Sequence, residues 1–160
     1  MYISFALLGA FLLVVAVYIF AAIFFVPKMA VRSMPVDIQK RINSLPNHPR
    51  WRTRVGYALV LLLLCAIIAI LIVAGVWSVR DNLSRVEVFL RYIIILGGYK
   101  VFDIVCLDWL LITKTHFFQH IFPVTEGCEG YHQFGFNRKT QARQCIGVMV
   151  ISLVLAFLLG

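Results

Sequence analysis

Three charged side chains lie deep inside an apolar stretch of the sequence, residues 86–112. Lys100 and Asp103 are three residues apart, so on an α-helix they share a face and can form an ion pair. Asp108 lies about 80° round the same helix from Lys100, so all three side chains can point into one bundle interior. A charge near the middle of a bilayer is costly and marks a functional site by default. We therefore expect Lys100, Asp103 and Asp108 to bind a polar or charged ligand: a proton, an ion or a lipid headgroup.

The loop after this stretch carries a second group of residues that could do chemistry. His116 and His120 stand at positions i and i+4, the spacing at which two imidazoles on one helix hold a metal ion. A glycine-punctuated segment follows, with further metal ligands or acid-base groups: Glu126, Cys128, Glu129 and His132. Since no metal motif is complete, two interpretations stay open. One is a site for a divalent metal, and the other is a polar loop whose aromatic side chains dip into the membrane interface.

Membrane helices have to position these residues, because the chain of 160 residues is 62% hydrophobic and only 14% charged. That composition excludes a water-soluble globule. A membrane span takes about 20 apolar residues, and four stretches meet or approach that length: 2–26, 55–78, 86–112 and 141–160. The sequence predicts an all-α polytopic protein, residues 1–160 forming one membrane domain built as a four-transmembrane-helix bundle, whose first stretch is a retained helix. Within the third stretch we expect Arg91 to snorkel to the outer face or to pair with Glu87.

The distribution of positive charge predicts the orientation of the spans. Residues 27–54 hold seven cations against Asp37 alone, and residues 113–143 hold Lys114, Arg138, Lys139 and Arg143 against two glutamates. By the positive-inside rule both loops are cytoplasmic and both termini lie outside. The formal net charge of +8 then reflects contact with anionic headgroups, and we expect no nucleic-acid partner, because no DNA- or RNA-binding motif accompanies it. The four cysteines fall in spans or cytoplasmic loops, so we expect free thiols.

The first loop contains a pattern typical of an amphipathic helix. Met34, Ile38, Ile42 and Leu45 recur at spacings of four, four and three residues. Ser33 stands before the pattern as a candidate cap, with Pro35 near the first turn and Pro46 at the end. We expect this short helix to lie on the inner leaflet as an interfacial brace. Docking of a partner protein is the alternative.

The run from Asp103 to Trp109, with Pro123, the segment Thr125–Gly127 and the pair Tyr131–His132, resembles small uncharacterised bacterial four-span membrane proteins. The resemblance covers about a quarter of the chain and implies no activity. It implies a place in the bacterial cytoplasmic (inner) membrane, and it supports grouping these residues into one site.

Three functions follow from these patterns. The first is a ligand-binding membrane protein with its site at Lys100, Asp103 and Asp108, acting in transport or as an accessory subunit. Such a protein would form a homo-oligomer or sit beside a larger membrane partner. The second is a membrane enzyme acting on a lipid or isoprenoid at the cytoplasmic face, with the histidines and glutamates of residues 116–132 as metal ligands or acid-base groups. The third is a structural accessory whose buried charges only set helix packing.

Overall fold

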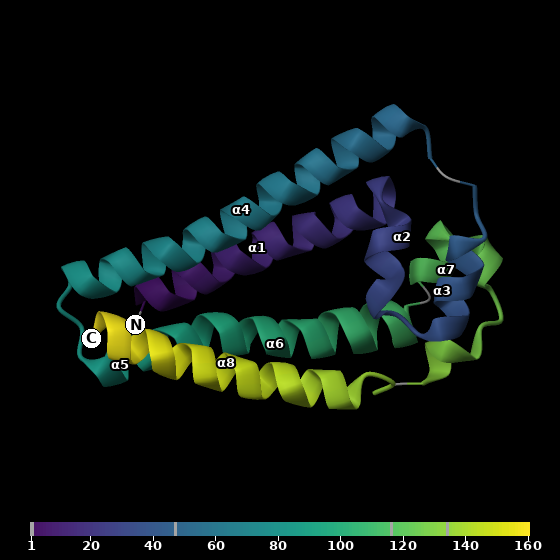
Figure 1. Cartoon of the computed structure of the whole chain (residues 1–160). Coiled ribbons are helices and arrows are strands. Elements are labelled where there is room, and N and C mark those ends of the chain that lie inside the picture. The colour runs from purple at the N-terminus through teal and green to yellow at the C-terminus, as the bar shows by residue number, and fades with distance from the viewer. Residues whose placement is uncertain (1, 47, 116, 134) are drawn as a thin grey trace. The chain divides into compact units, whose positions relative to one another are not determined.

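The computed structural model describes residues 2–46, 48–115, 117–133 and 135–160, and these residues form helices and turns without a strand (Figure 1). The all-α class is therefore confirmed for the described residues. Labels beginning with α mark α-helices, whereas η1, η4 and η5 are 3-10 helices and η2 and η3 are π-helices. In chain order the elements are α1 (Tyr2–Phe25), α2 (Pro27–Ala30), η1 (Val31–Ser33), α3 (Val36–Asn43), α4 (Arg50–Arg80), α5 (Arg85–Tyr92), η2 (Ile93–Gly97), α6 (Gly98–Phe102), η3 (Asp103–Lys114), α7 (Phe117–Ile121), η4 (Pro123–Thr125), η5 (Glu129–His132) and α8 (Arg138–Leu159).

Among the described residues, three helices are long and apolar enough to cross a membrane: α1 with 24 residues, α4 with 31 and α8 with 22. They correspond to the first, second and fourth predicted spans. Helix α4 extends beyond the predicted apolar stretch at both ends, and α8 begins three residues before the predicted start at 141. These helices are consistent with integration into a membrane, because a helix satisfies its own backbone hydrogen bonds where lipid offers none.

The third predicted span is helical throughout but changes its hydrogen-bonding pattern three times. It begins at α5, where the Glu87 carboxylate accepts hydrogen bonds from the backbone N–H and the hydroxyl of Ser84, at 2.9 and 2.8 Å. The run then passes through η2 and α6 into η3, a π-helix of 12 residues. This run is not among the three helices that qualify as membrane spans. The third predicted span, and with it a total of four, therefore stays a prediction.

The chain divides into two compact units, which are described separately. Unit 1 comprises Met1–Val15, Leu64–Phe102 and Arg138–Gly160. In it, α8 packs along α5 and η2, and these helices lie side by side in Figure 1. Gly98 gives close approach to Leu8 of α1, since an added Cβ would come within 2.8 Å of the leucine side chain.

Unit 2 comprises Ala16–Leu63 and Asp103–Asn137 and has a core of its own. The core residues come from the end of α1, from the segment α2 to α3 and from the segment η3 to η5: Ile23, Val31, Met34, Ile38, Ile42, Ile112, Phe118, Phe122, Cys128 and Tyr131. Apolar side chains contributed by segments about 80 residues apart in sequence thus make the main contacts of this unit.

The helix predicted in the first loop is present as α3. Its start differs from the prediction: Pro35 holds the N-cap position, whereas Ser33 ends the preceding 3-10 turn. The fixed φ of proline suits a helix start even without a capping hydroxyl. Ile38 and Ile42 are fully buried by protein, and Lys40 and Arg41 are exposed. The position of α3 on the inner leaflet stays a prediction.

Candidate functional site

Lys100 is the most deeply buried of the predicted ligand-binding residues, with 6% of its surface exposed. Its ammonium group donates to two amide oxygens of α8, Gln141 Oε1 at 2.5 Å and Gln144 Oε1 at 2.8 Å. The same Nζ atom lies 5.7 Å from the ring centre of Tyr99, and that ring packs edge-to-face with Phe11. Charge-assisted hydrogen bonds and a cation–π contact therefore replace part of the water that the ammonium group loses on burial.

The two glutamines were not predicted from the sequence. Gln141 and Gln144 are three residues apart at the start of α8, so they share a helix face. The only signal in the sequence is a pair of polar residues at the edge of an apolar run. Neutral amides are common at such edges, and nothing in residues 138–160 alone relates them to Lys100.

Asp103 and Asp108 both lie in η3, in unit 2. The boundary between the two units falls between Lys100 and Asp103, and the predicted ion pair stays a prediction. The angle expected for Asp108 assumed an α-helix, and that assumption is wrong for residues 103–114. A π-helix bonds residue i to i+5, so Asp103 and Asp108 lie on about the same side of η3. The Asp108 carboxylate accepts a hydrogen bond from the Asn137 amide at 3.2 Å.

Arg91, in unit 1, is buried rather than snorkelling outward, with 4% of its surface exposed. Its guanidinium donates to the backbone oxygen of Ala74 at 3.3 Å and to the Ser78 hydroxyl at 3.0 Å. Its ion pair is with Asp81, at 3.8 Å. The predicted partner, Glu87, instead caps the start of α5, because its carboxylate reaches the Ser84 N–H one turn back.

The residues proposed for metal binding or acid-base chemistry do not form a cluster in the described part of the chain. No three His, Cys, Asp or Glu side chains there come close enough together to hold a metal ion. His120 lies in α7, whereas Glu126, Glu129 and His132 are exposed around η5. His116 lies outside the described residues, so its pairing with His120 stays a prediction.

The loop between α7 and α8 instead holds a small buried polar network that braces unit 2. Thr125 donates to the backbone oxygen of Phe122 at 2.7 Å, and its hydroxyl lies 2.7 Å from that of Tyr131. The Gly130 N–H donates to the Asp37 carboxylate at 2.8 Å, and a Cβ at Gly130 would clash with Pro35. Glycine is therefore required where this loop meets the start of α3.

Burial also limits the chemistry open to the titratable groups of this loop. It raises the pKa of the Cys128 thiol; the Asp37 carboxylate acts in the same direction, and Arg41 opposes it. Burial likewise raises the pKa of the Tyr131 hydroxyl. Both groups are thus protonated at neutral pH, and a protonated thiol is a poor nucleophile and a poor metal ligand.

Comparison with known proteins adds no assignment: no family model, curated protein or solved structure matches the chain.

Proposed function

We propose that this chain is an integral membrane protein that holds a small charged ligand at Lys100. In this proposal the run from Arg85 to Lys114 is the third of four spans, and loops 27–54 and 113–143 face the cytoplasm. The observation that carries it is the buried ammonium of Lys100 held by the amides of Gln141 and Gln144. A charged residue within a span is expensive to insert and is a functional-site hypothesis by default.

The donor and acceptor inventory of this group favours an anion. The ammonium of Lys100 carries three donors and no acceptor, and each glutamine amide carries two N–H donors. Each amide oxygen accepts a hydrogen bond from Lys100. A ligand rich in acceptor oxygens, or a halide, complements such a set. The protein would act in transport or as an accessory subunit. In either role it would form a homo-oligomer or bind a larger membrane partner.

Titration of the purified protein with single anions tests the proposal. Wild-type protein in a neutral detergent is titrated with chloride, acetate or inorganic phosphate at constant ionic strength and pH, and its melting temperature is followed by tryptophan fluorescence. We expect one of these anions to raise the melting temperature with a saturable dependence, because binding to the folded state alone stabilises it.

Lys100→Met removes the charge and keeps most of the side-chain volume, and we expect it to weaken the response about tenfold or more. Gln144→Met, which keeps the ammonium, should weaken it less. Lys139→Met is the matched control, because it makes the same change at an exposed position of α8. An unchanged response in Lys100→Met, or no saturable response in wild type, would overturn the proposal.

A further inference from the structure

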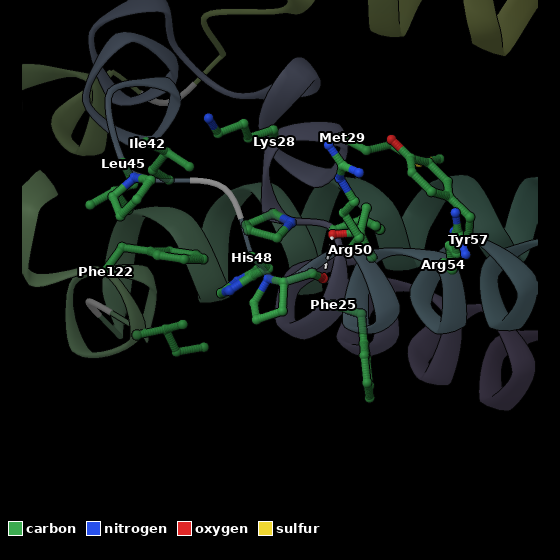
Figure 2. Close-up of a pocket in the computed structure, with 16 residues that line it drawn as sticks. Phe25, Lys28, Met29, Ile42, Leu45, His48, Arg50, Arg54, Tyr57 and Phe122 are labelled. Carbon is green, nitrogen blue, oxygen red and sulfur yellow. Dashed lines mark hydrogen bonds between the residues drawn. The ribbon is translucent and has the colours of Figure 1, made fainter.

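Unit 2 contains a cavity of about 750 Å³ where α1 ends and α4 begins (Figure 2). Its volume is in the range of pockets that bind small molecules. The walls come from the end of α1, from α2, from the C-terminal end of α3, from the first turns of α4 and from the residues at the end of α7. Helices α1 and α4 are both apolar enough to span a membrane. The end of α1 and the start of α4 therefore belong at the depth of the lipid headgroups.

The cavity wall carries cationic side chains. Lys28, Arg50 and Arg54 line it together with His48, and none of the described residues that line it is acidic. The structure shows no hydrogen bond or ion pair between any of these four side chains and another described residue. Arg52, between the two lining arginines, differs: it donates to the backbone oxygen of Phe24 at 2.9 Å and so ties α4 to the end of α1.

Most of the rest of the wall is apolar, and Thr53 and Tyr57 are its other polar residues. In Figure 2, Ile42, Leu45 and Phe122 gather at one side of the cavity, and Arg50 and Arg54 lie at the other. The acid nearest in sequence to these arginines is Asp37, whose carboxylate accepts the Gly130 N–H. The cavity therefore combines an apolar end with a cationic end, and such a surface complements a molecule with an acyl chain and an anionic head.

We infer that this cavity binds an anionic phospholipid of the surrounding leaflet, with the phosphate near Arg50 and Arg54 and an acyl chain against Leu45 and Phe122. Charge complementarity selects an anionic head, since Lys and Arg near a membrane surface attract acidic lipids. The apolar end selects a lipid over a free anion, because it adds acyl-chain burial to the binding. This site is separate from the anion site proposed at Lys100 and does not depend on it.

Native mass spectrometry of the detergent-solubilised full chain tests the inference, with phosphatidylglycerol, phosphatidylcholine and inorganic phosphate as probes. We expect one tightly bound phosphatidylglycerol in the wild type, with phosphatidylcholine and phosphate binding at least about tenfold more weakly. Arg50→Gln with Arg54→Gln should weaken phosphatidylglycerol binding about tenfold or more. Arg50→Lys with Arg54→Lys should keep most of it, because the charge remains.

The matched control is Arg32→Gln with Lys40→Gln, which removes the same charge from exposed positions of the same loop outside the cavity wall. Leu45→Trp fills the apolar end without changing the charge, and it should weaken phosphatidylglycerol while leaving phosphate unchanged. Equal losses in the cavity and control pairs would overturn the inference, because general electrostatic attraction would then explain binding. Phosphatidylcholine or inorganic phosphate binding as tightly as phosphatidylglycerol would also overturn it.

Discussion

Arg91 and Lys100 are both buried cations of unit 1. Two amide oxygens of α8 hold Lys100, and Arg91 has a carboxylate opposite it as well as Ser78 and a backbone oxygen. The Arg91 side chain is 5% exposed and that of Asp81 is 41% exposed. The charge of Arg91 is thus buried, while its counter-charge remains in contact with the surroundings.

This difference in exposure predicts that replacing Asp81 lowers the free energy of unfolding more than replacing Arg91. Asp81→Asn leaves a buried guanidinium without its carboxylate and should lower the free energy of unfolding by about 2 kcal/mol or more. Arg91→Met removes the buried charge, Asp81 stays solvated, and the Ser78 hydroxyl keeps its bond to Ala74 at 2.8 Å, so we expect a change below about 1 kcal/mol. Thermal melting in detergent measures both variants, and a larger loss in Arg91→Met would contradict this account.

At the scale of single elements, α3 shows how one helix is fixed by contacts with a distant segment. Ile38 and Ile42 face the core of unit 2, and Val36 on the same helix is 65% exposed. The Arg41 guanidinium donates to the backbone oxygen of Val124 at 3.2 Å, and Asp37 accepts the Gly130 N–H. The apolar side of α3 is therefore covered by protein, and its polar side chains hold the loop after α7.

Truncating Ile38 should consequently destabilise unit 2 far more than truncating Val36. Ile38→Ala removes three buried carbon atoms and leaves a cavity, so we expect a loss of about 2–4 kcal/mol in the free energy of unfolding. Val36→Ala acts at an exposed site on the same helix and should cost below about 0.5 kcal/mol. Similar losses for the two variants, measured by chemical denaturation in detergent, would show that the core of unit 2 does not hold α3.

In the run from Arg85 to Lys114, the side-chain directions cannot be calculated from α-helical geometry alone. Rotation of 100° per residue assumes α-helical hydrogen bonds, but η3 bonds i to i+5 over 12 residues. Within it, the Thr113 hydroxyl donates to the backbone oxygen of Asp108, five residues before it, at 3.0 Å. The side chains of Asp103 and Asp108 are therefore related by π-helical spacing, which residue types alone do not reveal.

At the scale of the whole molecule, the number of spans decides on which side of the membrane the termini lie. Four spans place both termini on one side, and three place them on opposite sides. The helical run 85–114 carries Arg91, Lys100, Asp103 and Asp108 in its interior, so its insertion requires that neighbouring helices satisfy these charges. Gln141 and Gln144 already do so for Lys100.

We predict that both termini face away from the cytoplasm and that residues 27–54 and 113–143 face it. Reporter fusions at either terminus, one type active only in the cytoplasm and the other only outside it, measure this directly. A further fusion after Asn82 should report the same side as the termini, because it lies between the second and third predicted spans. Termini on opposite sides would mean that residues 85–114 do not cross the membrane.

The sequence by itself determined the helical class and the three apolar helices α1, α4 and α8, because lipid leaves backbone groups no partner except those within a helix. It also predicted a helix in the first loop with Met34, Ile38, Ile42 and Leu45 on one face, since helical periodicity is a local property. It did not predict that protein buries the two isoleucines of α3. It did not predict the glutamines that hold Lys100, the pairing of Arg91 with Asp81, or the cationic and apolar cavity between α1 and α4. Those depend on which distant segments come together and on a change from α- to π-helical hydrogen bonding, and only the tertiary structure decides both.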